Sequence, residues 1–357
     1  MTSKILFTTA RVGRYTLKNR LVMAPMTRSR AGDDGVPGPL VPEYYAQRAS
    51  AGLIISEGIY PSAMGKGYVR TPGIHTDAQV EAWRKVTAAV HAREGLIFAQ
   101  IMHAGRISDP SLLPGHAVPV APSAIRPEGT TYTDAGMKRH VTPRALEKVE
   151  IGHIICEYAE ATRRALAAGF DGVELHAASG YLPMQFLSTG SNRRNDEYGG
   201  NAENRARFVV EALDAMSAVA GADRVGIKIA PEMAFNDISD TDPEQTYTTL
   251  LRLIGDTGLA YLHVTPYGTT VDYHALLKPL FRGAYLAGAG LDREKAAQLL
   301  AAGGADATVF GTLFVANPDL PERFRRGAPL NVPDTSTFYA SGAEGYIDYP
   351  TLEPLAA

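Results

Sequence analysis

The chain has 357 residues, of which 45% are hydrophobic, so it is long enough for one large barrel or two ordinary domains. A formal net charge of −3 lacks the basic excess with which proteins neutralise nucleic-acid phosphates. No apolar run approaches the roughly 20 residues of a membrane span, and no signal pattern precedes Ile5. We therefore expect a cytoplasmic protein acting on small molecules. The single cysteine, Cys156, is interpreted as a small buried hydrophobe in a reducing compartment.

Short apolar runs alternate with segments of helical periodicity along the whole chain. Eight of these runs predict strands, at residues 20–25, 53–57, 97–103, 172–176, 225–230, 261–265, 284–288 and 307–311. Helices are predicted at residues 42–50, 77–94, 143–168, 201–220, 243–257, 273–281, 292–302 and 319–326. Helix-start signals support several of them, such as Thr76 and Asp77 before Gln79.

Eight strand-helix units over this length predict an α/β fold, a closed (β/α)8 TIM barrel, better than an open sheet. Because there is no linker or low-complexity tract, residues 1–357 are expected to form a single domain. One connection is oversized and rich in proline and glycine: residues 105–142, after the third predicted strand, called here the excursion. Long loops in compact folds are usually functional, so we expect the excursion to cover the active-site mouth.

The segment Glu174-Leu-His-Ala-Ala-Ser-Gly-Tyr181 is the most informative part of the chain. It places His176, Ser179 and Tyr181 at the end of an apolar run, where a buried strand gives way to a turn. His176 and Ser179 can hold an oxygen, and Tyr181 can donate a proton. The segment therefore predicts a reduction in which electrons are added first and a proton second.

Other predicted strand ends carry residues that a barrel would bring to the same open end. They are Pro25-Met-Thr27, Gln100 to His103, and Lys228. The last two strands end in Gly288-Ala-Gly290 and in Gly311-Thr312, where such barrels often bind phosphate through backbone amides. Glycine after a strand is also plain turn chemistry, so phosphate binding and a structural turn both remain open on this pattern alone.

Characteristic segments occur in order over nearly the whole chain: Leu6-Phe7, KNRLVMAPMTR at 18–28, YYAQRAS at 44–50, QIMHAGR at 100–106, ELHAASGY at 174–181, QFL at 185–187, SN and R at 191–192 and 194, YGG at 198–200, ENR at 203–205, NPDL at 317–320 and GY at 345–346. Together they resemble the old yellow enzyme family of flavin-dependent ene reductases. The resemblance implies noncovalent FMN in an eight-stranded barrel. It also implies reduction by NADPH or NADH and reoxidation by an electron-poor alkene at the same face.

The resemblance also implies roles for residues that match the family pattern. Pro25, Met26 and Thr27 would lie beside the flavin, with the Thr27 hydroxyl near its O4, as in the branch typified by the yeast and enterobacterial enzymes. Gln100 and Lys228 would face the pyrimidine ring. The phosphate would lie on Gly288, Ala289, Gly290, Gly311 and Thr312. His176 and Ser179 would hold the substrate oxygen, Tyr181 would give the proton, and Met102 would line the substrate pocket. Tyr68 and Tyr346 could line the mouth and contact the substrate, or merely cover it.

Four positions depart from the family pattern. Lys228 replaces arginine, which keeps the charge but loses the two-pronged fit. Ser179 replaces histidine or asparagine and is shorter, so reduction of simple enones is expected to be poor or substrate choice shifted. Met102 replaces tryptophan and softens the pocket wall. Thr312 replaces an arginine at the phosphate, so weaker FMN retention is expected unless backbone amides or another base compensate.

Other interpretations remain open at this point. A metal-dependent hydrolase is disfavoured because the first strand offers no His-x-His pair, and no metal site is predicted. The same flavin fold could act as an oxidase, desaturase or isomerase, or only bind flavin. His103 and His263 are interpreted as structural, and Arg28 as fixing a loop. The segment 338–350 could pack between subunits, so a monomer or a homodimer is expected.

Overall fold

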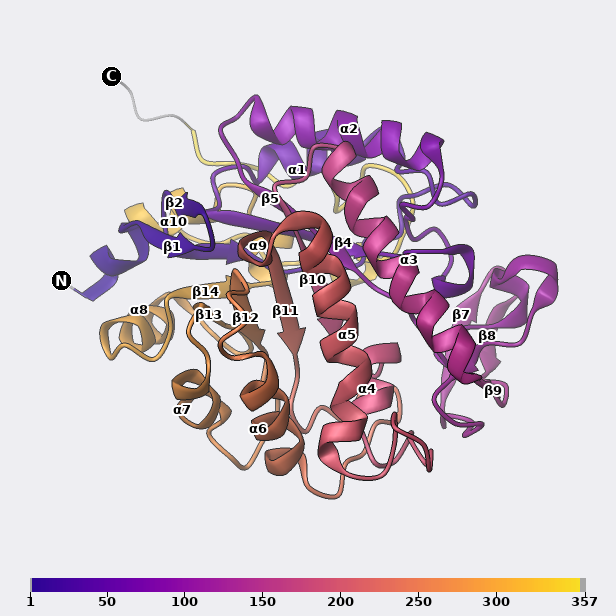
Figure 1. Cartoon of the computed structure of the whole chain (residues 1–357). Coiled ribbons are helices and arrows are strands. Elements are labelled where there is room, and N and C mark those ends of the chain that lie inside the picture. The colour runs from indigo at the N-terminus through magenta and orange to yellow at the C-terminus, as the bar shows by residue number, and fades with distance from the viewer. Residues whose placement is uncertain (1, 354–357) are drawn as a thin grey trace.

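The computed structural model describes residues 2–353 and consists of a parallel barrel surrounded by helices (Figure 1). The barrel closes in the order β10-β11-β12-β13-β14-β3-β4-β5, and every neighbouring pair is parallel. The strands are β3 (Leu21–Met23), β4 (Leu53–Ile59), β5 (Ile97–Ile101), β10 (Gly172–Ala177), β11 (Val225–Ile229), β12 (Tyr261–Val264), β13 (Ala284–Ala287) and β14 (Ala307–Phe310). All eight predicted strands and the TIM barrel are confirmed.

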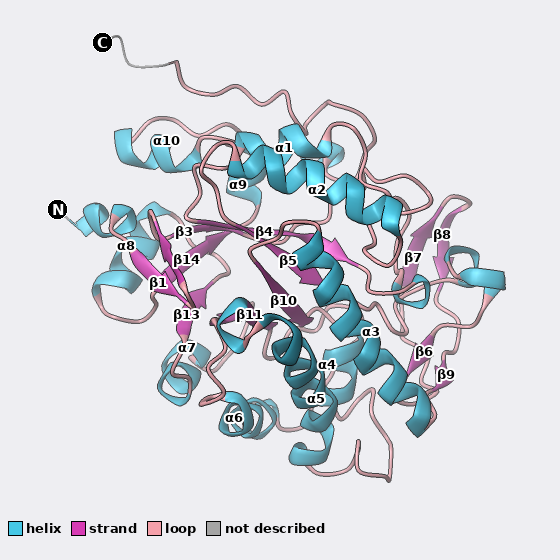
Figure 2. Ribbon diagram, turned by 45° about the horizontal axis from the view of Figure 1, so that its top comes forward, coloured by secondary structure: helices cyan, strands magenta, loops and turns pink. Residues whose placement is uncertain are grey.

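Helices cover the outside of the barrel (Figure 2). They are α1 (Val41–Gln47), α2 (Asp77–His91), α3 (Lys148–Ala167), α4 (Leu182–Leu187), α5 (Ala202–Ala220), α6 (Pro243–Ile254), α7 (Tyr273–Leu277), α8 (Arg293–Ala301), α9 (Thr312–Ala316) and α10 (Leu320–Arg326). Short 3-10 helices occupy Thr2–Phe7, Ala63–Gly65, Pro110–Leu112, Pro114–His116, Ala222–Arg224, Lys278–Leu280 and Thr335–Thr337. The short α4 and α9, directly after β10 and β14, were not predicted.

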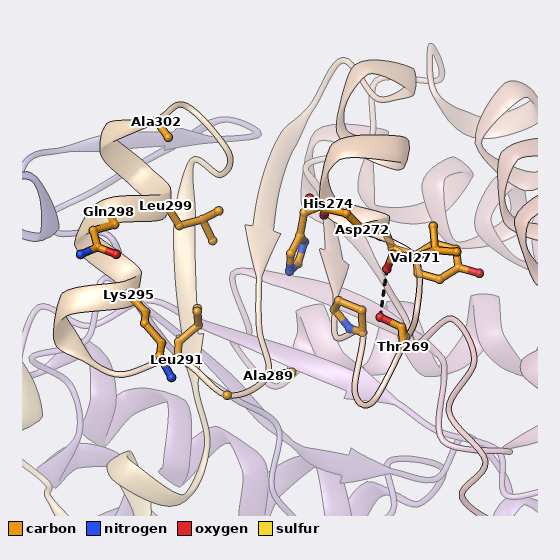
Figure 3. A pocket seen from close by; sticks show the side chains of 13 residues that line it. Thr269, Val271, Asp272, His274, Ala289, Leu291, Lys295, Gln298, Leu299 and Ala302 are labelled. Atoms are coloured by element: carbon orange, nitrogen blue, oxygen red, sulfur yellow. Dashed lines mark hydrogen bonds between the residues drawn. The ribbon is translucent and has the colours of Figure 1, made fainter.

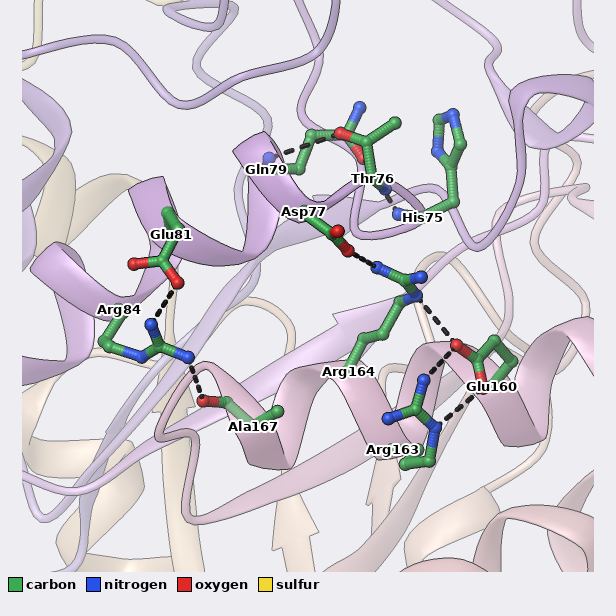
Figure 4. Close-up of polar contacts among 10 residues, drawn as sticks. All are labelled: His75, Thr76, Asp77, Gln79, Glu81, Arg84, Glu160, Arg163, Arg164 and Ala167. Atoms are coloured by element: carbon green, nitrogen blue, oxygen red, sulfur yellow. Dashed lines mark hydrogen bonds and ion pairs between the residues drawn. The ribbon is translucent and has the colours of Figure 1, made fainter.

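Helix α2 begins where the sequence indicated, because Thr76 and Gln79 form a capping box (Figure 4). Polar contacts then tie α2 to α3. Arg164 of α3 pairs with Asp77 at 2.8 Å, and Arg84 of α2 donates to the Ala167 carbonyl at 3.1 Å. Such exposed contacts contribute little energy individually, but they fix the register between two helices that flank β5.

The antiparallel hairpin of β1 (Ala10–Val12) and β2 (Tyr15–Leu17) packs its apolar side chains against the barrel interior. Val12 and Leu17 belong to one buried cluster with residues of six barrel strands, among them Phe98 and Leu286. This cluster fills the amino-terminal part of the barrel with side chains. Access to polar residues higher in the barrel is therefore from the carboxyl ends of the strands, called here the mouth.

The excursion contains the strands β6 (Val120–Ala121), β7 (Thr130–Thr133) and β8 (Gly136–Arg139), and β9 (Arg144–Ala145) lies between its end and α3. Strands β7 and β8 form a hairpin that lies apart from the barrel strands in Figures 1 and 2. Arg106 anchors the start of the excursion by donating to the carbonyl of Asp237, in the loop after β11, at 2.6 Å. The excursion thus contacts a loop that borders the mouth.

Cys156 departs from the sequence interpretation. The residue lies on α3, and its side chain is exposed rather than buried. Its neighbours Ile154 and Tyr158 occupy the buried face of the helix, and helical periodicity turns the residue between them outward. The apolar run at residues 154–156 therefore does not mean that every residue in it is buried.

Gly226 of β11 is required by close packing inside the barrel. A Cβ at this position would lie 2.3 Å from Cζ of Tyr261 on the adjacent strand, and the ring has no room to retreat because Tyr261 is fully buried. The absence of a side chain at 226 thus lets Tyr261 turn into the barrel beneath the polar residues.

We predict that Gly226→Ala lowers the free energy of unfolding by about 1–3 kcal/mol, the usual cost of overpacking. Denaturant unfolding followed by circular dichroism measures this. The control is Gly152→Ala in α3, where an added Cβ meets no heavy atom within 4 Å, and where alanine should stabilise by about 0.5–1 kcal/mol. Equal stability of the two variants would contradict the packing argument.

Candidate active site

Polar side chains occupy one half of the barrel interior. Gln100 of β5 is in register with Glu174 of β10, and His176 of β10 is in register with Lys228 of β11. Lys228 is in turn in register with His263 of β12. Glu174 contacts His263 although β11 separates their strands, so this contact runs through the barrel interior. Four adjacent strands thus carry a group of polar residues below the mouth, called here the polar wall: Gln100, Glu174, His176, Lys228 and His263.

His176 is buried and neutral. Burial, together with the nearby Lys228, lowers the pKa of His176 well below its usual value. Its Nδ1 has no hydrogen-bond partner among the residues that the structure describes. An unpartnered buried nitrogen is costly, so this ring is suited to bind a ligand atom.

Tyr181 follows the turn after β10 and directly precedes α4, so its ring comes back toward His176. The two rings meet edge to face with centroids 4.9 Å apart. The Tyr181 hydroxyl donates to the Tyr68 hydroxyl at 3.1 Å. Burial raises the pKa of Tyr181 well above its usual value, so the phenol keeps its proton and can act only as an acid toward a strong base.

Ser179 lies between these two residues in a left-handed backbone conformation, with φ of 58°. Its carbonyl accepts a hydrogen bond from Nδ2 of Asn236 at 2.8 Å, which joins the turn after β10 to the loop after β11. No hydrogen bond to the Ser179 hydroxyl occurs within residues 2–353. The hydroxyl is therefore uncommitted, and the backbone shape at 179 is one that asparagine adopts readily.

Met102 and Tyr68 form part of a buried apolar cluster with Tyr181. Met102 is 2% exposed, and its Sδ would lie 2.7 Å from a Cβ at Gly58. The absence of a side chain at Gly58 thus makes room for Met102 in this cluster. Both Met102 and Tyr68 therefore lie beside Tyr181, the predicted proton donor.

The assignment of Tyr346 to the substrate pocket is not supported by its position. Tyr346 is fully buried and stacks on Tyr44 with ring centroids 4.2 Å apart. Tyr339, from the same segment, is 60% exposed, and it adds to the effect of burial, which raises the pKa of both Tyr181 and Tyr68. Tyr339 is thus the aromatic of this segment that borders the mouth, and no sequence signal distinguished the two.

Arginines hold this segment in place. Arg28 donates to the carbonyls of Phe338 at 3.2 Å and Gly345 at 2.8 Å. Arg30 donates to the Phe338 carbonyl at 2.9 Å and to further carbonyls of the segment. We call this pair the arginine clamp. It explains why Arg28 is fully buried, and it supports the interpretation of Arg28 as fixing a loop.

Pro25, Met26 and Thr27 follow β3 and are partly exposed at the mouth. The backbone N–H of Ala24 donates to the Phe310 carbonyl at 2.9 Å, which aligns the ends of β3 and β14. Met26 also packs over Gly311, where a Cβ would lie 3.1 Å from its Sδ. These residues form a strip along the edge of the mouth. Their strands, β3 and β14, lie across the barrel from β10 and β11 of the polar wall.

The turn after β13 has two consecutive left-handed residues, Ala289 with φ of 71° and Gly290 with φ of 65°. A Cβ at Gly290 would meet no heavy atom within 4 Å, so this backbone faces open space. Gly311 precedes α9, and the Thr312 side chain is exposed. Backbone N–H groups in such turns favour anions, whereas no basic side chain follows Gly311.

A groove of about 610 Å³ continues from Ala289 and Gly290 between α7 and α8 (Figure 3). His274 and Asp272 face Lys295 and Leu299 across it. The groove shares only the turn after β13 with the predicted site. It is therefore a feature of the outer helix layer rather than of the polar wall.

The residues of the mouth fit FMN. Lys228 forms no ion pair within residues 2–353, so its charge is available to the electron-rich pyrimidine edge of a flavin. His176 and His263 each have a buried ring nitrogen without a partner. The open left-handed turn at 289–290 fits a phosphate. Within the described part of the chain, no group of three potential metal ligands occurs.

Comparisons with known proteins agree with this class of flavin barrel. Residues 5–331 match the model of the NADH:flavin oxidoreductase / NADH oxidase family. A 12-oxophytodienoate reductase of Oryza sativa subsp. japonica is 42% identical and covers 98% of this chain and 94% of its own. A structure of morphinone reductase with tetrahydroNAD is 48% identical, with a TM-score of 0.94 and 98% of both chains covered. The old yellow enzyme homologue from Zymomonas mobilis is 40% identical, with a TM-score of 0.94 and coverage of 97% and 99%.

The site therefore defines a flavin-dependent oxidoreductase built on a TIM barrel. The chain belongs to the NADH:flavin oxidoreductase / NADH oxidase family, whose cofactor is FMN. The predicted resemblance to old yellow enzymes is confirmed. No helix in residues 2–353 is long and apolar enough to cross a membrane.

We predict that Thr312→Arg tightens FMN binding about tenfold, because a charge-assisted hydrogen bond to phosphate contributes about 1.5 kcal/mol. The dissociation constant is measured by the quenching of FMN fluorescence on binding to apoprotein. Thr312→Gln is the matched control, since it adds length and polarity without charge. Equal affinities of all three proteins would indicate that the backbone amides already saturate the phosphate.

Proposed function

We propose that the protein reduces the C=C bond of α,β-unsaturated carbonyl or nitro compounds with electrons from NADH or NADPH. FMN, held by the polar wall and the turn at 289–290, would supply the hydride transfer between nicotinamide and alkene. The observation that carries the proposal is the pairing of neutral His176 with protonated Tyr181, ring centroids 4.9 Å apart.

His176 is proposed to polarise the alkene by donating a hydrogen bond to the carbonyl or nitro oxygen. A neutral imidazole has one N–H to donate, and the lowered pKa of His176 keeps it in that form. Ser179 is the second candidate for this oxygen, from the turn that Asn236 fixes. Because serine is short, a water molecule between hydroxyl and substrate is one way to complete the contact.

Tyr181 is proposed to donate the proton that completes the reduction. Its raised pKa keeps the proton on the phenol until a carbanion develops next to it. The Tyr68 oxygen lies 3.1 Å from the Tyr181 oxygen, so the Tyr68 O–H can turn and stabilise the resulting phenolate. Met102 and Tyr339 flank this pair and are proposed to contact the substrate's apolar parts.

A single mouth serves both substrates, since apolar side chains fill the opposite end of the barrel. Nicotinamide and alkene are therefore proposed to bind in turn, giving ping-pong kinetics. The structure of morphinone reductase in complex with tetrahydroNAD supports the use of a nicotinamide cofactor by this chain. We further propose a cytoplasmic enzyme that is a monomer or a homodimer, which light scattering after gel filtration would distinguish.

The purified protein tests the proposed function directly. It should be yellow, bleach anaerobically with NADPH or NADH, and regain its visible absorbance when cyclohexenone or a nitroalkene is added. Product analysis should show the saturated ketone or nitroalkane. A colourless protein that ignores added FMN, or a reduced protein that no activated alkene reoxidises, would refute the proposal.

We predict that Tyr181→Phe slows the alkene step about 10²–10⁴-fold, the usual contribution of a positioned general acid. Reduction of the flavin by NADPH should be unchanged, because no proton donor is needed there. Anaerobic stopped-flow absorbance measures the two half-reactions separately. Tyr132→Phe on the exposed hairpin is the control, and equal loss in both half-reactions would remove Tyr181 from this role.

We predict that Ser179→Asn raises the rate with small enones, up to the 10²–10³-fold that one oxyanion donor contributes. The left-handed backbone at 179 accepts asparagine without strain, so folding should be unaffected. Ser179→Ala is the control and should match the unmodified protein if the serine hydroxyl does not reach the substrate. A fall in rate with asparagine would show that serine is fitted to a different substrate.

A further inference from the structure

Glu174 is a fully buried carboxylate to which the proposed chemistry assigns no task. Burial of a lone carboxylate is very costly, so its oxygens require donors. Oε1 accepts from Nε2 of Gln100 at 2.7 Å, and Oε2 lies 3.0 Å from Nδ1 of His263. These partners come from β5 and β12, on either side of the polar wall.

The contact with Glu174 determines which end of the Gln100 amide faces the mouth. A carboxylate can only accept hydrogen bonds, so the amide NH2 group must point toward it. The reversed amide would place two oxygens in contact. The Gln100 carbonyl oxygen therefore points away from Glu174, and no hydrogen bond to it occurs within residues 2–353. The chain thus presents an acceptor, which matches the imide N–H of a flavin pyrimidine.

The same contact fixes the tautomer of His263. Its Nδ1 carries the proton that is donated to Glu174, so Nε2 is left as an acceptor. Nε2 is buried and has no partner within residues 2–353. It would lie 3.4 Å from a Cβ placed at Gly288, so it faces the turn after β13. Burial lowers the pKa of His263 although the contact with Glu174 opposes this effect, so the ring is neutral beside Lys228.

Glu174 is also the negative charge that acts on Lys228. Lys228 is in register with His176 of β10 and with His263 of β12, and Glu174 lies two residues before His176 on β10. Burial lowers the pKa of Lys228, and Glu174 opposes that effect. Both histidines have lowered pKa values and are neutral. Without Glu174, no charge described in this wall would keep the ammonium protonated.

We propose that Glu174 is a positioning residue for the flavin, which orients the Gln100 amide with its oxygen toward the cofactor and keeps Lys228 charged. This inference rests on the proposed function, because it assumes that the polar wall binds the pyrimidine edge of FMN. A charged Lys228 stabilises the anionic reduced flavin, so Glu174 acts on the cofactor's potential through Lys228 rather than by contact.

The test is the midpoint potential of FMN bound to Glu174→Gln holoenzyme, measured between pH 6 and pH 9. At pH 6 the midpoint potential of the variant should equal or exceed that of the unmodified protein, because a negative charge is lost while Lys228 remains protonated. As the pH rises, Lys228 in the variant should lose its proton. Reduction should then become about 10–100-fold less favourable than in the unmodified protein, about 30–60 mV for a two-electron couple.

Lys228→Gln provides the matched control. In that background, Glu174→Gln should leave the pH dependence of the potential unchanged. With Lys228→Gln alone, the midpoint potential should be lower than that of the unmodified protein by the same amount at every pH from 6 to 9. This single-variant comparison remains decisive if Glu174→Gln does not fold. If the difference in potential between the two proteins shrinks as the pH rises, Lys228 titrates despite Glu174, and the inference is overturned.

FMN affinity at pH 6 tests the orientation of the Gln100 amide. Glu174→Leu, which removes every acceptor at this position, should weaken FMN binding in the unmodified background and have little further effect with Gln100→Ala. Additive losses of FMN affinity in the double variant would overturn the role of Glu174. So would a midpoint potential of Glu174→Gln that changes with pH as that of the unmodified protein does. Failure of the unmodified protein to bind FMN would instead refute the proposed function, so the two failures are distinguishable.

Discussion

Burial of charge inside a closed barrel is the constraint on which this site depends. A barrel without free edges satisfies its backbone internally, but an inward-pointing charged side chain must find partners inside or at the open end. Here Glu174, Gln100 and His263 satisfy one another, while Lys228 and His176 remain available at the mouth. The polar wall is thus incomplete by itself, and a planar heterocycle with donors, acceptors and partial negative charge would complete it.

Backbone conformation supplies the second half of the site. The left-handed residues Ala289 and Gly290 shape the turn where we propose that phosphate binds, and the left-handed Ser179 shapes the turn where we propose that the substrate binds. Such conformations are costly for most residues and tend to persist where function requires them. In this proposal side chains hold the electron-accepting end of the ligand and main-chain groups hold its phosphate end, so the phosphate contact does not depend on an arginine at position 312.

Most of the barrel could be predicted because buried parallel strands are continuous apolar runs, which residues 172–176 and 225–230 illustrate. The short α4 and α9 could not, because five or six residues show too little periodicity. His176 and Tyr181 were identified from spacing and resemblance. Tyr346 was misplaced because an irregular segment has no periodicity to show which aromatic is buried. Arg28 and Arg30, which are distant in the sequence, hold the backbone of this segment and so determine which aromatic is buried.

The arginine clamp has a consequence for how the enzyme could diversify. Its guanidinium groups bind main-chain oxygens of Thr337, Phe338, Gly342, Glu344 and Gly345. Every residue type carries such an oxygen, so anchorage of the segment does not depend on most of its side chains. Tyr339 can therefore be exchanged, by evolution or by an engineer, while the path of the chain beside the mouth is retained. Selectivity for new alkenes is thus separable from stability at this position.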